Sequence, residues 1–384
     1  MTIADRAWCE VSLDAIEHNI SQFKRIATNS KIMAVVKADA YGFGAVEVSK
    51  AVLGTDVCML GVATADEAVS LRENHIEKPI LILGHTPPQY AQQLVQLDIT
   101  QTIYCLDTAS IISKAAKKLG KTAKVHIKID TGMNRLGFLL RDDTIKRILE
   151  ISNLPNIEIE GLFTHFSCAD EQDESFTNLQ FERFMEFSAE LEKAGLHIPV
   201  KHVCNSSAAM RFPNMHLDMI RVGISLYGFY PSELKYDLSL KPAMMFKTKV
   251  ALIKEIGSGE KISYGGKFVT TKKSKVATLP VGYADGYSRL LSGKAKVIIN
   301  GQFAPVVGTI CMDQCIIDTT HVNNISIGDE VVLFGRQGKL ENSVETLAKI
   351  EGTINYEILC LIGKRVPRYY IRKDKIVKIL NYLV

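Results

Sequence analysis

One pattern, repeated eight times, dominates the first two-thirds of the sequence. From Ile32 to Ser225, apolar runs of strand length alternate with stretches that have the apolar spacing of helices. The predicted strands cover residues 32–36, 58–62, 79–83, 99–105, 124–130, 157–165, 200–204 and 219–225. Such alternation implies a parallel sheet. Eight units in roughly 230 residues fit a closed (β/α)8 barrel of the TIM type.

An open, doubly wound sheet is the alternative arrangement for alternating strands and helices. No G-x-G-x-x-G motif follows the first strand, which argues against it. The fifth strand also favours a barrel with a polar interior, because residues 125–130 alternate strictly between apolar and polar. That alternation would place His126, Lys128 and Asp130 inside, where charges are costly unless they are paired.

The alternation of predicted strands and helices ends near Pro231. Residues 231–242 are typical of a linker, and the runs after them are short and β-rich. These runs are residues 246–256, 275–280, 296–299, 304–307, 315–318 and 330–334. We therefore expect a barrel domain at residues 10–235 and a mostly-β C-terminal domain at residues 236–384, which an N-terminal strand (1–9) joins. Asp14 is expected to cap the helix that follows this strand.

Composition excludes several classes of function. The 384 residues carry 46 Lys and Arg against 42 Asp and Glu, and a net charge of +4 is too small to indicate a nucleic-acid or membrane surface. The N-terminus lacks the pattern of a signal peptide, and no apolar run approaches the ~20 residues that span a bilayer. Eight scattered cysteines without a C-x-x-C pair argue against zinc, so we expect no metal and a reducing cytoplasm.

The active site of a barrel lies at the carboxyl ends of its strands. Lys37 ends the first strand, where partial desolvation favours the neutral amine that forms Schiff bases. A lone strand-end lysine more commonly just reaches solvent. Here, however, other strand ends and their loops also carry reactive or ligand-binding groups: Tyr41, Arg135, His165, Asn205, Ser206, Arg221 and Gly223.

The loops after the seventh and eighth strands frequently bind phosphate in barrels. In this chain they contain Ser206-Ser207 and Gly223-Ile224, whose hydroxyl and backbone N–H groups suit a phosphate dianion. A phosphate site opposite a strand-end lysine implies a phosphorylated carbonyl ligand. Pyridoxal 5′-phosphate meets that description.

With these residues in place, the chain closely resembles the alanine racemase family along nearly its whole length. The barrel stretches that carry the resemblance are AVVKADAYGFG at Lys37, KIDTGMNRLGF at Arg135, THFSCAD at His165, NSSA at Ser206 and IRVGISLYG at Arg221. In the β domain they are ISYGGKF at Tyr264, PVGYADGYSR at Tyr283, CMDQ at Met312 and NYEI at Tyr356. Together these motifs are highly specific.

The resemblance implies a role for each residue. Lys37 would hold pyridoxal 5′-phosphate and act as one acid/base, and Tyr264 would be the other. The implied cofactor-binding residues are Lys37, Tyr41, His165, Asn205, Ser206, Arg221, Gly223, Ile224 and Tyr356. Arg135 and the Met312 backbone would bind the substrate carboxylate, beside Tyr264. Tyr283, Cys311 and Asp313 would support the site, and Lys128 corresponds to a lysine that family members carry as a carbamate beside Arg135.

The implied function is a cytoplasmic, homodimeric alanine racemase that supplies D-alanine for peptidoglycan, with active sites shared between subunits. A serine or broad-specificity racemase on the same scaffold is one alternative, although serine-racemising relatives lack the tyrosine at Tyr356 and broad-specificity relatives carry an export signal. A non-catalytic pyridoxal-phosphate carrier is another, although carriers resemble the barrel alone. Thr309 and Asn134 depart from residues common in the family, and Thr309 leaves the outer entrance of the site open to question.

Overall fold

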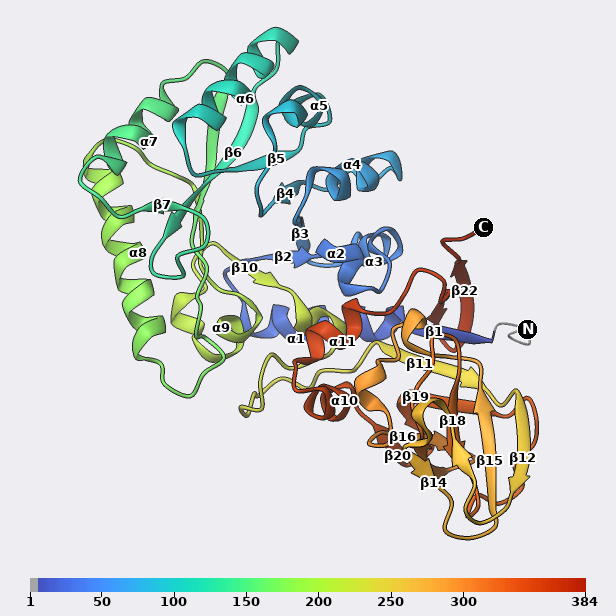
Figure 1. Ribbon diagram of the computed structural model, residues 1–384. Helices are drawn as coiled ribbons and strands as arrows, with labels where there is room; N and C mark the ends of the chain where they lie inside the picture. Colours follow the sequence, from blue (N-terminus) through green and yellow to red (C-terminus); the bar gives the residue numbers. More distant parts are fainter. Residues whose placement is uncertain (1–5) are drawn as a thin grey trace. The chain divides into compact units, whose positions relative to one another are not determined.

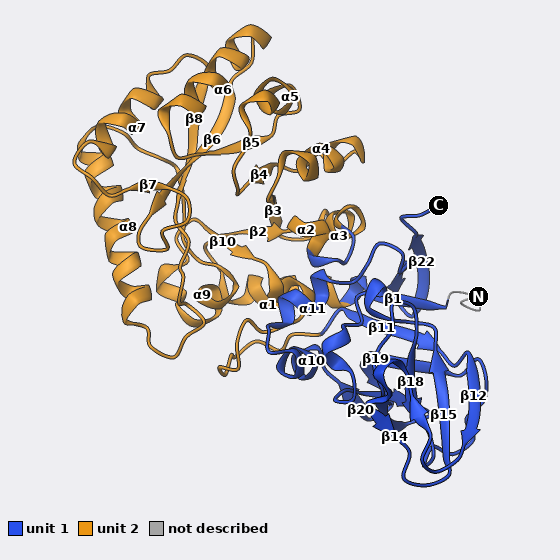
Figure 2. Cartoon of the chain, viewed as in Figure 1, with its two compact units in different colours: residues 1–14, 41–44, 242–384 blue, residues 15–40, 45–241 orange. Residues whose placement is uncertain are grey.

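The computed structural model describes residues 6–384 and divides the chain into two compact units, which Figure 2 shows in two colours. The barrel unit comprises Ala15–Ala40 and Ala45–Lys241. The β unit comprises Met1–Asp14, Tyr41–Gly44 and Pro242–Val384. The short segment Tyr41–Gly44 thus groups with the β unit, although it lies within the barrel sequence. The first five residues of the expected N-terminal strand lie outside the described residues.

The barrel unit is built on eight main parallel strands (Figure 1). They are β2 (Lys31–Val35), β3 (Val57–Val62), β4 (Ile80–Ile82), β5 (Thr100–Ile103), β6 (Ala123–Asp130), β8 (Ile157–Phe163), β9 (Val200–His202) and β10 (Met219–Val222). Their order is β10-β2-β3-β4-β5-β6-β8-β9, and a short strand β7 (Phe138–Leu139) pairs with β6. The ring is nearly closed because the Arg221 N–H donates to the Cys204 carbonyl across 3.1 Å. The predicted barrel is confirmed.

Helices follow most of the strands, as the apolar spacing predicted. They are α1 (Leu13–Ile26), α3 (Ala45–Val52), α4 (Ala65–Glu73), α5 (Ala91–Gln96), α6 (Leu106–Leu119), α7 (Thr144–Ser152), α8 (Ser175–Lys193) and α9 (Ser206–Arg211). The predicted cap at Asp14 is wrong: α1 already begins at Leu13, and the Asp14 carboxylate accepts from the Lys373 backbone N–H instead. After β10 the chain forms only a short 3-10 turn, η3 (Ile224–Tyr227).

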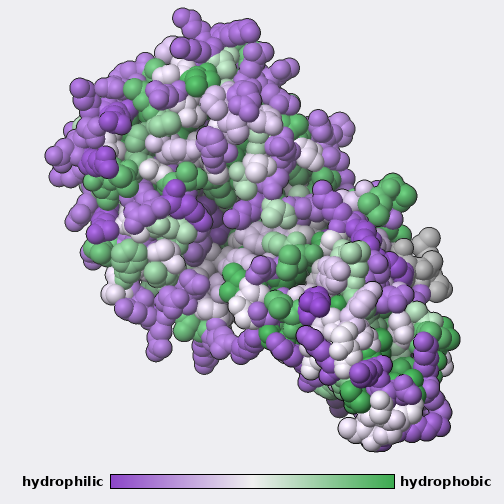
Figure 3. Space-filling view, viewed as in Figure 1, coloured by the Kyte–Doolittle hydropathy of each residue, from purple (hydrophilic) through white to green (hydrophobic). Residues whose placement is uncertain are grey.

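The barrel interior has an apolar layer and a polar layer. Met33, Met59, Leu81 and Met219 form a buried cluster, since these long side chains from neighbouring strands can interdigitate. His126, Lys128 and Asp130 on β6 are all buried, as the strict alternation of that strand predicted. The polar layer therefore needs internal partners for its charges. On the face in Figure 3, the helices around this interior, including α6, α7 and α8, present mostly hydrophilic residues.

The β unit contains an extended sheet with the order β12-β15-β18-β17-β16-β19-β11-β1-β21-β22. Its strands are β1 (Ala7–Ser12), β11 (Met244–Lys249), β12 (Leu252–Ile256), β15 (Ser274–Leu279), β16 (Lys296–Ile299), β17 (Gln302–Val307), β18 (Cys315–Asp318), β19 (Glu330–Gln337), β21 (Arg368–Arg372) and β22 (Lys375–Leu380). Strand β20 (Leu340–Asn342) pairs with β19, and β13 (Lys261–Ile262) pairs with β14 (Phe268–Val269). The N-terminal strand β1 runs antiparallel to β11 and parallel to β21.

Two details of the β unit differ from the sequence prediction. Residues 246–256 form two strands, β11 and β12. The pairing of β11 with β19 ends at Lys249, and the Ala251 N–H then donates to the carbonyl of Thr278 on β15, the partner of β12. Two helices, α10 (Val344–Glu351) and α11 (Asn355–Cys360), follow the predicted strands and had not been foreseen. Tyr356 lies on α11. Within residues 6–384, no helix is both long and apolar enough to cross a bilayer.

Candidate active site

Lys37 lies just before a turn with an unusual backbone conformation. It follows β2, and the next four residues, Ala38 to Tyr41, all have φ between 52° and 55°, the left-handed region. None of them is glycine, so each costs about 1–2 kcal/mol. The Glu67 carboxylate supports the turn. One oxygen accepts from the Ala38 N–H in the turn, and the other accepts from the Ala63 N–H after β3, both at 2.7 Å. Strain of this kind gathers at functional sites. Sequence reasoning missed Glu67, although the Thr64-x-x-Glu67 capping box was visible.

Arg221 lies fully buried at the end of β10 and organises the polar layer. One guanidinium nitrogen donates to His202 Nδ1 and to the His202 carbonyl, and the other donates to the Thr164 and Val203 carbonyls and to His165 Nδ1, all at 3.0–3.1 Å. Because arginine only donates, both imidazoles must accept through Nδ1 and carry their proton on Nε2. His165 is thereby fixed as an Nε2–H donor.

The chain of contacts continues from Arg221 to the far side of the barrel. His202 Nε2–H donates to His126 Nδ1 across 2.9 Å, which leaves His126 Nε2–H facing a Glu160 oxygen at 3.4 Å. Gly161 makes this possible, since a Cβ there would overlap the His126 ring. The hydrogen bonds therefore run in one direction from Arg221 to a carboxylate.

Burial is the main cause of the pKa shifts in this layer. It lowers the pKa of His126, His165 and His202, with Arg221 adding to the effect at each, so the three imidazoles are neutral at pH 7. Burial also lowers the pKa of Arg221, to about 10, which still leaves the guanidinium charged. The hydrogen bond from His126 lowers the pKa of Glu160 to about 2.

Cations gather at the ends of the barrel strands. Burial, followed by Arg135 and Arg221, lowers the pKa of Lys128 to about 8, and its ammonium lies 5.4 Å from the centroid of the Phe163 ring. Lys37 and Arg135 also lower the pKa of His165, so all four cations act on the same region. Such an excess of positive charge suits a ligand that carries several negative charges.

The Asp130 carboxylate shapes the loop that carries Arg135. Its two oxygens accept from the backbone N–H groups of Gly132, Asn134 and Arg135 at 2.9–3.0 Å. This cation-bearing loop is therefore held by main-chain bonds. Asn134 has φ of 55°, a conformation that asparagine tolerates better than most residues.

The two predicted phosphate loops meet in the barrel unit. The Gly223 N–H donates to Ser206 Oγ across 2.8 Å, which leaves the Ser206 hydroxyl proton for another acceptor. The neighbouring Ser207 hydroxyl is committed elsewhere, donating to the Ala169 carbonyl at 2.7 Å. Asn205 caps α9 through the Ala208 N–H. The structure thus separates Ser206, which is available for a ligand, from Ser207, which is structural.

In the β unit, Tyr264 stands on a braced turn with its side chain 73% exposed. Ser263 has φ of 63°, and its hydroxyl donates to the Thr309 carbonyl at 2.5 Å. The Thr309 hydroxyl in turn donates to the Tyr264 carbonyl at 3.0 Å. Thr309, singled out in the sequence only as a departure from relatives, therefore braces the Tyr264 backbone.

The other candidates of the β unit form two groups. Tyr41 and Tyr356 lie together, with ring centroids 6.0 Å apart. Cys311, Met312 and Asp313 form a loop against Tyr283, whose backbone N–H donates to the Cys311 carbonyl at 3.1 Å. The Met312 side chain is 52% exposed. Among residues 6–384, no cluster of His, Cys, Asp or Glu is arranged to hold a metal ion.

The fold defines the class: a (β/α)8 barrel with a lysine before a left-handed turn and a cluster of cations at its strand ends, and a second, mostly-β unit. The sequence matches the family models for the alanine racemase N-terminal domain (residues 11–231) and C-terminal domain (residues 243–370). The chain belongs to the alanine racemase family, whose members depend on pyridoxal 5′-phosphate.

Relatives match over their full length. An alanine racemase of Clostridium perfringens is 50% identical over 98% of each chain. Among solved structures, an alanine racemase of Clostridium difficile 630 has a TM-score of 0.95 at 44% identity and covers both chains completely. That of Bacillus anthracis with bound L-Ala-P has a TM-score of 0.94 at 37% identity, covering 100% of this chain and 99% of the other.

Proposed function

We propose that this protein interconverts L-alanine and D-alanine, using pyridoxal 5′-phosphate bound at Lys37. The observation that carries the proposal is the placement of Lys37 on a braced left-handed turn, in a barrel that also carries buried Arg221 and the paired Ser206–Gly223 loops. Appearance of D-alanine from L-alanine, and the reverse, tests it. We further propose that the chain acts in the cytoplasm and supplies D-alanine for peptidoglycan.

The residues of the barrel fit the cofactor. Ser206, Ile224 and Asn205 would offer hydroxyl, backbone and amide groups to the phosphate, and Gly223 would keep the Ser206 hydroxyl proton directed at it through its own N–H. Tyr41 and Tyr356 would complete the coordination. Arg221 would face the pyridine nitrogen. Because a guanidinium can only donate hydrogen bonds, the nitrogen would have to accept and would stay unprotonated. His165 would pack beside the ring. When bound, the cofactor supplies an electron-withdrawing system that acidifies the α-carbon of an amino acid.

Two proton-transfer groups would serve the reaction. Racemisation removes the α-proton from one face and returns a proton to the other, and a single base would have to cross between the faces. Lys37 Nζ and the Tyr264 hydroxyl can each hold or release a proton, one on each face. Arg135 and the Met312 N–H would bind the carboxylate and so fix the α-carbon between them.

A serine or broad-specificity racemase remains the second candidate, because the same barrel groups would serve any amino acid. Tyr264, Met312 and Tyr356 are large side chains that would crowd the substrate's own side chain. Exclusion of one methylene or hydroxyl by packing is worth only about 1–3 kcal/mol, so we expect graded preference for alanine over serine. Relative kcat/KM values for the two amino acids decide this point.

We also propose that Lys128 is a carbamate in the working enzyme. Its buried amine is surrounded by the cations Arg135, Arg221 and Lys37, and a pKa of about 8 leaves a useful fraction neutral. The neutral amine would attack carbon dioxide, forming an N–C bond and releasing one proton to solvent. The product is an anion beside Arg135, which would turn repulsion into pairing.

The carbamate makes a testable prediction. Protein equilibrated with ¹³C-bicarbonate should show a carbamate ¹³C signal that is missing from Lys128→Met. Removal of dissolved carbon dioxide should lower activity reversibly. Lys121→Met, which changes an exposed lysine near the same strand, is the matched control and should keep the signal. A wild-type protein without the signal, yet fully active, would contradict the proposal.

We propose further that the enzyme is a homodimer in which the β unit of one protomer completes the barrel site of its partner. Tyr264 and Met312 support this idea, because both are large side chains left more than half exposed. Lys37→Ala and Tyr264→Ala chains, each inactive, should then regain about a quarter of wild-type activity when mixed and refolded, since half of the dimers are mixed and each holds one intact site. No recovery, despite mass-spectrometric proof of mixed dimers, would mean that each site is built from one chain.

A further inference from the structure

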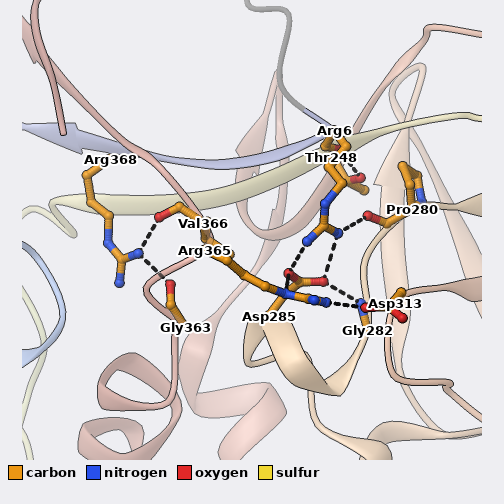
Figure 4. Close-up of polar contacts among 10 residues, drawn as sticks. All are labelled: Arg6, Thr248, Pro280, Gly282, Asp285, Asp313, Gly363, Arg365, Val366 and Arg368. Carbon is orange, nitrogen blue, oxygen red and sulfur yellow. Dashed lines mark hydrogen bonds and ion pairs between the residues drawn. The ribbon is translucent and has the colours of Figure 1, made fainter. Parts of the chain in front are cut away.

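Asp285 is a buried carboxylate of the β unit with several hydrogen-bond partners, and the proposed mechanism gives it no role. It ends the short turn η5 (Tyr283–Asp285), and its side chain is fully buried. Arg6 donates to both oxygens, at 2.5 and 3.0 Å, and Arg365 Nε donates to one of them at 2.8 Å (Figure 4). The Gly282 N–H donates at 2.9 Å. Burial alone would raise the pKa of Asp285, but the hydrogen bonds from Arg6 and Arg365 outweigh it and hold the pKa below its usual value.

Arg365 connects this carboxylate to the loop that carries Met312. Its Nη2 donates to the Asp313 carboxylate at 2.5 Å. Figure 4 shows the Arg365 guanidinium between the Asp285 and Asp313 carboxylates. The turn and the loop are also joined by main-chain bonds: the Tyr283 N–H donates to the Cys311 carbonyl and the Ala284 N–H to the Met312 carbonyl, both at 3.1 Å. One network therefore sets the position of both segments.

Peptide geometry gives these bonds a direction. The Cys311 carbonyl and the Met312 N–H belong to the same planar, trans peptide and point in opposite directions. When Tyr283 holds the Cys311 carbonyl on the side of the turn, the Met312 N–H must point away from the turn. The close approach leaves little freedom, because a Cβ at Gly282 would overlap the Cys311 and Met312 carbonyls.

We infer that Asp285 and Arg365 are positioning residues that aim the Met312 N–H at the substrate carboxylate. The inference rests on the proposed function, in which that N–H binds the carboxylate. Neither side chain touches the substrate. Asp285, clamped by Arg6, holds the turn in place, and the turn and Arg365 together hold the loop. Loss of the clamp should thus weaken substrate binding while leaving the barrel groups intact.

Asp285→Asn tests the inference, because it keeps the shape of the side chain and removes its charge. We expect the KM for alanine to rise about tenfold in both directions, as for a misaligned charge-assisted hydrogen bond, with kcat changed much less. Inhibition by propionate, a carboxylate without an amino group, should weaken by the same factor. The absorbance of the bound cofactor should not change. Arg365→Lys, which can bridge only in part, should give an intermediate rise.

Arg336→Gln breaks an exposed ion pair with Glu341 in the same unit and is the matched control, expected to behave as wild type. If Asp285→Asn fails to fold, Arg365→Lys and Asp313→Asn still give the answer, because both keep the Arg6–Asp285 pair. A folded variant with unchanged KM and propionate inhibition, or with a fall in kcat alone, would overturn the inference. Failure of the proposed function is a separate result, since it would appear as a wild-type protein that does not racemise alanine.

Discussion

Tyr264→Phe is expected to lose α-deuterium exchange from L-alanine in heavy water while keeping exchange from D-alanine. The variant removes one hydroxyl from a side chain that is 73% exposed in the β unit, so the fold should be unaffected. If Lys37 and Tyr264 act on opposite faces, each serves one enantiomer, and loss of one acid/base typically costs about 10²–10⁴-fold. Lys37→Ala should lose both exchanges, because Lys37 would also hold the cofactor.

The measurement is the rate of α-deuteration of each enantiomer, followed by NMR. Tyr90→Phe, which removes an exposed hydroxyl from the barrel unit, is the matched control. Equal loss of exchange from the two enantiomers in Tyr264→Phe would mean that the two-base assignment is wrong. Retention of both exchanges in Lys37→Ala would remove Lys37 from the mechanism altogether.

Acid is expected to destabilise the barrel through its buried histidines. The folded-state pKa of His126, His165 and His202 is lowered by burial, whereas in the unfolded chain each titrates near 6.5. Below that pH the unfolded chain binds more protons than the folded one, so the free energy of unfolding falls as the pH falls. Each histidine lowers the free energy of unfolding by up to about 1.4 kcal/mol for each pH unit of acidification. The three together lower it by up to about 4 kcal/mol per pH unit.

Urea unfolding at pH 7.5 and 5.5 measures this slope. His202→Gln should reduce it by about a third, because glutamine can accept from Arg221 and donate to His126 without titrating. His197→Gln, at an exposed position, should leave the slope unchanged. The charged-histidine explanation fails if the slope in His202→Gln equals that of wild type. Glu160 has a folded-state pKa of about 2, against 4.5 as its ordinary value. The free energy of unfolding should therefore keep falling as the pH drops below 4.5, because the unfolded chain binds this proton first.

The barrel was predictable because its signal is local and repeated. Several strands of the ring, such as β2, β3 and β4, are short apolar runs. The strict alternation in β6 led to the prediction that His126, Lys128 and Asp130 lie inside, and all three are buried. The rule for barrel sites predicted that Lys37, Arg221 and the Ser206–Gly223 pair lie at strand ends, which is where the structure places them. These predictions needed only the period of the side chains and the rule that barrel sites lie at strand ends.

What could not be predicted depends on partners distant in sequence. The left-handed turn after Lys37 contains no glycine, so propensity gives no warning of it, and its support by Glu67 comes from 29 residues away. Arg6 and Asp285 are 279 residues apart, yet they form the clamp behind the Met312 loop. Asp14 failed as a helix cap for the same reason, since its carboxylate is taken by the Lys373 backbone.

As an alanine racemase with two opposed proton-transfer groups, this chain must exchange the α-proton for a solvent proton each time it inverts alanine. The most direct test of this requirement is wild-type protein, loaded with pyridoxal 5′-phosphate, incubated with L-alanine in heavy water and scored for chirality and α-deuterium together. We expect D-alanine that is almost fully α-deuterated from the first turnovers, with serine converted more slowly. D-Alanine that retains the original proton would contradict the two-group mechanism, and alanine that stays L without deuteration would contradict the function itself.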